Sequence, residues 1–407
     1  MPYLRTPLLA AWLFALCPLA LSLAAQAQIP GNKVTVGVLT DMTGQFSDGV
    51  GAGSVAAARL AAQDFAPESG GLQVKIIFAD HQNKPDIGAG IARKWFGQEG
   101  VAAIVDLPNS GVALAVAGIA HDQHRTALTS SSMSSDLTGK ACQPTTVQWV
   151  TDTWAQGRST AAEMVPQGLN NWYFLTVDYA LGHALEADAT AAVTTLGGKV
   201  AGASRNPFNT SDFAGPLVQA QASGANVLAL ASTGADLVNA LKQASEFGVT
   251  RTLTPAALFA ELSDIRAIGL PVAQGLQLTE AFYWDLNDST RAWSARYGAT
   301  MGGLMPTEDQ AGVYSATLAY LRAARDAGTI EGKQVVAAMR RAPIADPLFG
   351  TVMIRADGRA VHEMYRFRVK APGESRGPSD LYQLLATIPA ANAFRALDQG
   401  GCPMVRP

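Results

Sequence analysis

Two polar segments each directly follow an apolar strand of the predicted sheet, and they contain the residues best suited to chemistry. Asn109 and Ser110 come just after the strand that ends at Val105, and the serine-rich run Thr129–Ser135 follows the next strand. Ligands of open α/β sheets bind at the carboxyl ends of strands. Hydroxyls and free amides there can bind a carboxylate without burying an opposite charge. Helix capping and loop polarity would explain one such segment. For two at neighbouring strand ends, a binding site is an equally good explanation.

Aromatic side chains are expected at similar edges. Phe46 lies in the loop after the first strand, Tyr179 follows the strand that ends at Val177, and Tyr283 follows the strand that ends at Thr279. Core packing is the ordinary role of such residues. Gathered around one cleft, they would instead form the walls of a site for a flat or branched apolar body.

The sequence lacks the patterns of common catalytic and metal sites. The five histidines stand in no recognised catalytic frame. His121 and His124 lack a third ligand in sequence, and a solvated helix end is the better interpretation. Gly51, Gly53 and Ala56 loosely match a dinucleotide fingerprint, but a loop separates them from the preceding strand. We predict that the protein is not an enzyme and holds no metal and no cofactor.

The composition bounds the partner classes. The chain has 407 residues and a formal net charge of −3, and 48% of its residues are hydrophobic. This hydrophobic share excludes disorder of the bulk, and the slightly acidic balance argues against a nucleic-acid partner. No stretch after the first 28 residues is long and apolar enough to cross a membrane. We therefore expect no stable membrane insertion of the mature chain.

The N-terminal residues have the pattern of a secretory signal peptide. Arg5 precedes an apolar run from Leu8 to Leu23, and Ala25-Gln26-Ala27 forms a small-x-small cleavage site. The run is short for a membrane span, which argues against an uncleaved anchor. We predict that residues 1–27 are removed by cleavage after Ala27 and that the mature chain is exported.

The cysteines fit an exported protein. Cys17 lies in the apolar run after Leu16, where a lipoprotein signal requires a small residue, so we expect it to leave with the signal peptide. Cys142 and Cys402 remain, and an even number of cysteines in an exported chain predicts a disulfide. Two buried free thiols are the alternative.

Strands and helices alternate along the mature chain, which predicts parallel sheets covered by helices on both faces. Expected strands, mostly compact apolar runs, cover 34–39, 74–79, 102–105, 172–177, 199–204, 227–231, 276–279, 351–354 and 364–369. Expected helices cover 55–65, 87–98, 112–124, 184–196, 213–222, 235–247, 290–297, 309–327 and 332–341. The pattern restarts near residue 150, so we predict two doubly wound α/β lobes with a cleft between them. Lobe 1 would comprise 28–148 plus 282–345, and lobe 2 would comprise 149–281 plus 346–407.

The whole mature chain resembles the branched-chain amino-acid (leucine-binding) family, the periplasmic substrate-binding proteins of ABC transporters. The segments that carry the resemblance are Val36–Gly44, Thr129–Thr138, Asp178–Gly182, Phe208–Phe213 and Gln310–Tyr314. The resemblance implies a type I periplasmic binding protein fold, with two lobes joined by three crossover segments and closed on the ligand by hinge motion. It also implies a periplasmic location and a partnership with membrane permease subunits.

The resemblance assigns roles to particular residues. The ligand carboxylate would be bound by Asn109, Ser110 and the segment Ser131, Ser132 and Met133. The aromatic walls would be Phe46 and Tyr179, with Tyr283 nearby, and an ammonium group would be held near Glu261, with Ser232 and Thr233 across the cleft.

Met133 is a departure from the family pattern, because amino-acid binders usually have a small hydroxyl residue there. A thioether prefers an apolar or aromatic body, which favours a flat organic acid over leucine. The segment Phe282–Leu286 and the paired cysteines also resemble uptake proteins for aromatic carboxylates. The expected function is therefore the capture of a small organic acid, either an aromatic carboxylate or a branched-chain or hydrophobic amino acid, for import. A ligand sensor that reports to a regulatory partner is the alternative.

Overall fold

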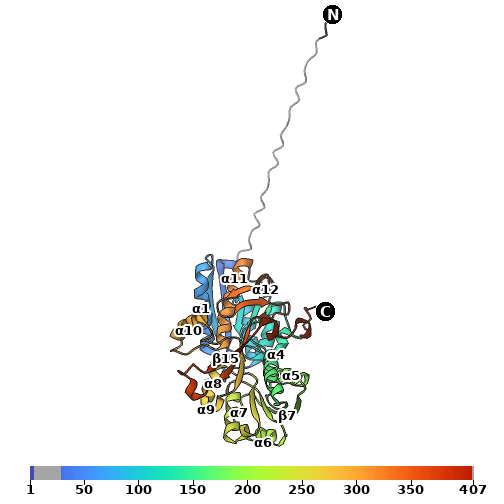
Figure 1. Ribbon diagram of the computed structural model, residues 1–407. Helices are drawn as coiled ribbons and strands as arrows, with labels where there is room; N and C mark the ends of the chain where they lie inside the picture. The colour runs from blue at the N-terminus through green and yellow to red at the C-terminus, as the bar shows by residue number, and fades with distance from the viewer. Residues whose placement is uncertain (4–28, 406–407) are drawn as a thin grey trace.

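The computed structural model describes residues 1–3 and 29–405. Nearly all of the predicted signal peptide, with Cys17 and the cleavage site after Ala27, lies outside the described residues. Two α/β lobes lie one above the other in Figure 1, as predicted, with the C-terminus beside the upper one. Within the described part of the chain, no helix has the length and apolar character needed to span a membrane.

Lobe 1 is built on a five-stranded sheet with the order β2-β1-β3-β4-β5, in which all neighbours are parallel. Its strands are β1 (Lys33–Thr40), β2 (Gln73–Asp80), β3 (Ala103–Asp106), β4 (Thr126–Thr129) and β5 (Thr146–Gln148). Its helices are α1 (Gly51–Phe65), α2 (Pro85–Gly97), α3 (Ser110–Asp122), α10 (Asp288–Thr300), α11 (Glu308–Ala327) and α12 (Gly332–Met339).

Lobe 2 repeats this plan with a four-stranded parallel sheet of order β7-β6-β8-β9. Its strands are β6 (Asn171–Val177), β7 (Lys199–Asn206), β8 (Val227–Ala231) and β9 (Thr254–Ala257). Its helices are α4 (Thr153–Met164), α5 (Ala180–Thr195), α6 (Ala214–Ala222), α7 (Gly234–Glu246), α8 (Leu262–Ile268) and α9 (Leu270–Ala273). β6 and β8 are buried along nearly their whole length, as their apolar runs predict.

The last part of the chain forms two antiparallel sheets. One has the order β10-β14-β15 and the other the order β11-β12-β13. Their strands are β10 (Gln277–Glu280), β11 (Ile344–Asp346), β12 (Gly350–Ile354), β13 (Ala360–Val361), β14 (Met364–Val369) and β15 (Tyr382–Ile388), and the short helix α13 (Ala390–Ala393) follows.

Core packing divides the late segments between the lobes. Phe282, α11 and α12 pack into the core of lobe 1, and so do Leu348, Val352 and Phe394. Phe367 packs into the core of lobe 2. The sequence pattern predicts that all of 346–407 belongs to lobe 2, whereas these contacts support a division in which 346–361 and the segment after β15 belong to lobe 1. The chain therefore enters lobe 2 again before β14 and returns to lobe 1 after β15, so it makes one crossing more than the three expected.

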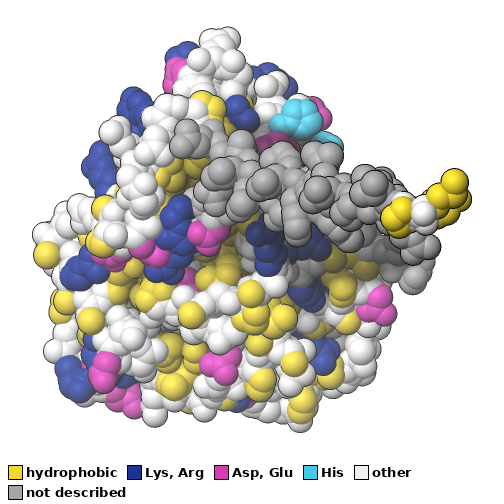
Figure 2. Space-filling view, turned by 90° about the horizontal axis from the view of Figure 1, so that it is seen from above, with side chains coloured by type: hydrophobic (Ala, Val, Ile, Leu, Met, Phe, Trp, Pro, Cys, Tyr) yellow, Lys and Arg dark blue, Asp and Glu magenta, His cyan; other side chains and the backbone are white. Residues whose placement is uncertain are grey.

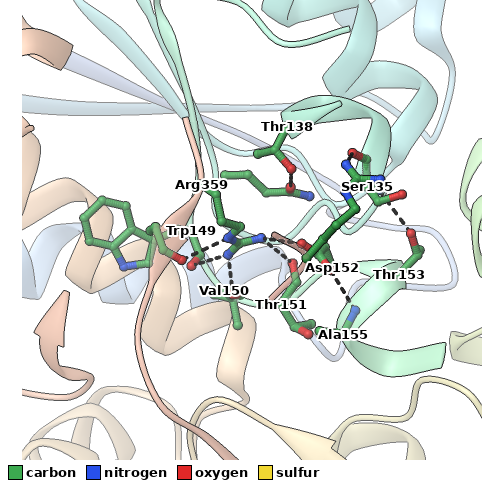
Figure 3. Close-up of polar contacts among 12 residues, drawn as sticks. Ser135, Thr138, Trp149, Val150, Thr151, Asp152, Thr153, Ala155 and Arg359 are labelled. Atoms are coloured by element: carbon green, nitrogen blue, oxygen red, sulfur yellow. Dashed lines mark hydrogen bonds and ion pairs between the residues drawn. The ribbon is translucent and has the colours of Figure 1, made fainter. Parts of the chain in front are cut away.

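The first crossing, segment 149–152, is held by a buried arginine (Figure 3). The Arg359 guanidinium is fully buried and donates to the carbonyl oxygens of Trp149, Val150 and Thr151, and it pairs with the Asp152 carboxylate at 3.4 Å. The carbonyl oxygens of Trp149 and Val150 also lie 3.0 and 3.1 Å from His362 Nε2. Buried backbone carbonyls need hydrogen-bond partners, and at this crossing the Arg359 and His362 side chains provide them.

The structure pairs Cys142 with Cys402, so the predicted disulfide is present and the free-thiol alternative is wrong. Cys142 precedes β5 in lobe 1, so the bond anchors the returning C-terminal segment to that lobe. Arg395 adds a hydrogen bond of 3.0 Å from Nη2 to the Ser135 carbonyl oxygen.

Candidate ligand-binding site

The strand orders locate the candidate site. In lobe 1 successive strands are added to one side of β1 and then, from β3 onward, to its other side, and in lobe 2 the same change of side occurs between β6 and β8. Open α/β sheets bind ligands in the crevice at such switch points, outside the carboxyl ends of the strands. The residues at these ends are Asp41 and Phe46 after β1, Asp106 to Ser110 at β3, Tyr179 after β6, and Ser232 and Thr233 after β8.

The loop after β1 is fixed by the buried Asp41 carboxylate. Its oxygens accept hydrogen bonds from the backbone N–H groups of Gly44 at 2.7 Å and Phe46 at 3.0 Å, and from Asn83 Nδ2 at 2.6 Å. Asp41 thereby sets the position of Phe46, which is itself 9% exposed. The Gln45 side chain next to it reaches lobe 2, where its Nε2 donates to Asp236 at 3.4 Å.

An aromatic bridge connects the lobes at this point. The ring of Phe46 meets Phe208 edge-on with centroids 5.7 Å apart, and Phe208 meets Tyr179 with centroids 5.1 Å apart. The Tyr179 hydroxyl is buried without a hydrogen-bond partner. Phe46 and Tyr179 are therefore brought together as predicted, through Phe208. Phe208 begins one of the segments that carry the family resemblance, but it was not predicted as a site residue.

The hydroxyls predicted for a carboxylate lie together at the ends of β3 and β4. Ser132 Oγ donates to Ser110 Oγ at 3.2 Å, and both residues are buried. Asn109 Oδ1 is occupied as the cap of α3, since it accepts from Gly111 and Val112 N–H groups. Ser131 Oγ donates to the Asp106 carboxylate. Sequence reasoning missed Asp106, although an acidic residue that directly ends an apolar strand could have revealed it.

Glu261 crosses the cleft from lobe 2. It caps α8 in a reciprocal arrangement with Asp264, which in turn accepts from Thr233 Oγ1 at 3.1 Å. Gly49 of lobe 1 lies so close to Glu261 that a Cβ on Gly49 would overlap the glutamate Oε2. Around this contact is a cavity of about 180 Å³ whose lining comes from both lobes and includes Phe46, Gly49, Thr233, Glu261, Ser263 and Asp264.

Two predicted residues lie in apolar cores. Tyr283 stacks on Tyr382 with centroids 4.9 Å apart, and its hydroxyl donates to the Ser379 carbonyl oxygen at 3.0 Å. These contacts are those of a lobe 2 core residue, so Tyr283 does not belong to the candidate site.

Met133 also lies in a core, where it packs with Trp172, Leu181 and neighbours, and Tyr179 lies against the same cluster. Met133 thus supports the aromatic wall from behind. Ser232 is buried at the end of β8.

Burial raises the pKa of the carboxyl groups around the cleft. The pKa of Asp106 is raised to about 6, although the Ser131 hydrogen bond opposes the shift. The pKa of Glu261 is raised well above its usual range. Burial is the larger cause, and the negative charge of Asp264 is the second. At the start of α11, burial raises the pKa of Glu308 to about 8 and that of Asp309 well above normal.

No described residues form a group of three or more His, Cys, Asp or Glu side chains arranged to hold a metal ion. His121 and His124 lie at the end of α3 and just beyond it, and His124 Nδ1 is 3.9 Å from a Glu331 carboxylate oxygen. The arrangement of the cleft is therefore that of a binding site made of hydroxyls, carboxyls and aromatic rings.

Two α/β lobes with a cleft between their strand ends, joined by extended crossings, define a hinged binding protein. Residues 33–376 match the periplasmic binding protein family, and the chain belongs to this family. A periplasmic binding protein from Burkholderia mallei is 39% identical, with a TM-score of 0.90, over 92% of this chain and 100% of its own.

Two further solved structures place the chain in context. A branched-chain amino-acid ABC transporter ligand-binding protein from Burkholderia xenovorans is 36% identical, with a TM-score of 0.81, over 91% of this chain and 99% of its own. An ABC transporter solute-binding protein from R. palustris, solved with benzoate, is 18% identical with a TM-score of 0.79, over 91% and 99%, and shows the shared fold alone. No curated protein matches the chain. The family and these neighbours are binding proteins, as expected.

Proposed function

We propose that the protein is the extracytoplasmic solute-binding component of an ABC importer. It captures a small organic solute by hinge closure in the periplasm and delivers it to membrane permease subunits. The aromatic bridge carries the proposal, because Phe46 of lobe 1 and Tyr179 of lobe 2 meet through Phe208, and Phe46 also lines a cavity to which both lobes contribute. Side chains from two lobes can enclose a ligand only if the lobes open and close.

The solute classes expected from the sequence are aromatic carboxylates and hydrophobic amino acids. The aromatic bridge suits the apolar body of either class. The buried hydroxyls of Ser110 and Ser132 suit a polar head, and Glu261 suits an ammonium group. Glu261 therefore favours a hydrophobic amino acid over a simple aromatic acid.

Thermal unfolding of the exported protein against a solute panel tests this function. A ligand present at about 100 times its Kd adds about 2.7 kcal/mol of stability, which raises Tm by a few degrees. Deleting the gene should then abolish uptake of the solute that binds. If uptake persists and only a transcriptional response to the solute is lost, the protein is a sensor and the transport role is wrong.

A further inference from the structure

A cavity of about 260 Å³ lies beside the segments that join the lobes, and we call it the hinge cavity. Its lining residues come from α4, β10, β14, β15 and α13. None of them also lines the cavity in the cleft. The hinge cavity is therefore a separate space, and the solute-binding function proposed above makes no use of it.

All four crossings contribute to the wall of the hinge cavity. Trp154 follows the first crossing, segment 149–152, and Thr279 lies in β10, just before the second. Met364 lies at the third crossing, where β14 begins, and Ile388 lies at the fourth, where β15 ends. A molecule bound in this cavity would contact every segment whose backbone must change when the lobes move.

The buried part of the wall suits an apolar body. Ala155, Met364 and Ala393 are buried and line the cavity. The two hydroxyl side chains of the wall satisfy each other, since Ser159 Oγ lies 2.6 Å from Thr279 Oγ1. Apolar surface that enters this space leaves water without separating a polar group from its partner.

The charge beside the hinge cavity is positive. The charged residues among its described lining are Arg158 and Arg366, and both are basic. Arg366 is neutralised by its ion pair with Glu163. The ion pairs of the described residues include none to Arg158. Its guanidinium lies over the Trp154 ring, 5.6 Å from the ring centroid, which orients it. On the face of the molecule in Figure 2, by contrast, basic and acidic side chains are interspersed.

The Arg158 guanidinium stands at the border of two spaces. Arg158 and Asn392 line both the hinge cavity and a neighbouring cavity of about 510 Å³. Asp188 also lines the neighbouring cavity, but its carboxylate already accepts hydrogen bonds from Ser135 Oγ at 2.7 Å and Thr153 Oγ1 at 2.6 Å. A carboxylate at this border would meet the fork of a guanidinium and the donor of an amide.

We propose that the hinge cavity is a second ligand site, which binds a small organic monoanion. The ligand carboxylate binds Arg158 and Asn392, and its short apolar body fills the hinge cavity against Ala155, Met364 and Ala393. One arginine without an ion pair matches one negative charge. The site is independent of solute capture, because the cleft can bind its solute with the hinge cavity empty.

A matched set of probes tests the charge and the body of the ligand. Hexanoate, hexanol and hexylamine share one tail and differ in charge, and acetate has the carboxylate without the tail. In titration calorimetry, we expect hexanoate to bind tighter than the other three, and added salt to weaken its binding but not that of hexanol. In crystals soaked with a hexanoate that carries bromine at the end of its tail, anomalous scattering should place the bromine in the hinge cavity.

Two variants test the location. Ala162 lines the hinge cavity and is exposed, so Ala162→Trp fills the cavity without entering the core and should abolish hexanoate binding. Arg158→Gln should weaken hexanoate binding about 10-fold and leave hexanol unchanged. The matched controls are Ala222→Trp, at an exposed alanine of α6, and Arg93→Gln, at an exposed arginine of α2, and both positions lie outside the two cavities.

The outcomes are decisive in both directions. Hexanoate binding that is lost in Ala162→Trp and kept in Ala222→Trp supports the site. Equal hexanoate affinity of wild type and Ala162→Trp overturns it, and so does a bromine located in the cleft or the absence of hexanoate binding. Equal affinity for hexanoate and hexylamine overturns the carboxylate assignment. These variants leave the cleft residues unchanged, so failure here leaves solute capture standing, and a failed uptake test leaves the hinge cavity standing.

Discussion

Hinge closure can be tested at Gly49, where the two lobes make their tightest contact. A Cβ at this position would overlap Glu261 Oε2 and would lie 3.2 Å from Ser263 Oγ, both on lobe 2. Gly49 does not have a positive φ, so alanine is compatible with its backbone. Gly49→Ala should therefore leave each lobe intact and oppose only their closed contact.

The magnitude follows from these contacts. Inserting a methyl group into packed surroundings costs typically 1–3 kcal/mol, and the Glu261 carboxylate has little room to move because it is buried. This cost falls on the closed form alone, so ligand affinity should drop by about 5- to 150-fold. In the open form, the smaller chain entropy of unfolded alanine should raise stability by about 0.4–1 kcal/mol.

Two measurements check the prediction. Titration calorimetry with the solute found in the thermal panel gives the affinity loss, and small-angle scattering with and without that solute gives the compaction on closure. Gly90→Ala is the control, since a Cβ at Gly90 in α2 would meet nothing within 4 Å. If Gly49→Ala binds and compacts like wild type, the contact between Gly49 and Glu261 does not define the closed form.

Three further predictions concern stability. Replacing Cys142 and Cys402 by serine should lower the free energy of unfolding by about 5–6 kcal/mol in the chain-entropy model, because the bond closes a loop of 260 residues; an unchanged Tm in calorimetry would contradict this. Arg359→Met should cost about 3–5 kcal/mol in urea unfolding, since it removes the guanidinium from the buried Thr151 carbonyl and from the buried Asp152 carboxylate; a neutral effect would refute the role of Arg359 at the hinge. Glu308, with a folded pKa of about 8, keeps most of its proton until pH approaches 8, whereas the unfolded chain has released it above about pH 4.5, so the ligand-free protein should lose about 1.5–2 kcal/mol of stability between pH 6.5 and 8. Glu308→Gln should flatten this slope, and an unchanged slope would show that other groups cause it.

The sign of the pH effect follows from the direction of the shift. Burial raises the pKa of Glu308 above its unfolded value of 4.5, so the folded state holds the proton more tightly. The resulting stability is fully present below about pH 4.5 and is lost as pH rises through 8. His362 acts oppositely, because burial lowers its pKa from 6.5 to about 4. Only above about pH 7.5 is this histidine neutral in both states, so from pH 6.5 upward it offsets the loss by no more than about 0.4 kcal/mol and the carboxyls dominate the slope.

The parallel lobes could be predicted from sequence because their buried strands are compact apolar runs. The run expected at 172–177 is β6 nearly in full, and that expected at 227–231 is β8. Strand β15 escaped because it has neither a buried apolar run nor an alternation: Tyr382 is buried, but the three residues after it are exposed in succession. Helix α1 begins at Gly51 rather than at residue 55, because tertiary contacts stabilise a glycine-rich first turn that helix propensity disfavours.

The candidate site was only partly predictable, for a physical reason. Phe46, Tyr179 and Glu261 could be placed because each follows or precedes a recognisable element. The importance of Asp106 depends on a neighbour 25 residues away, Ser131, and on a lobe that no local pattern positions. Tyr283 was misjudged for the converse reason, since its core partner Tyr382 lies in a strand that the sequence did not reveal.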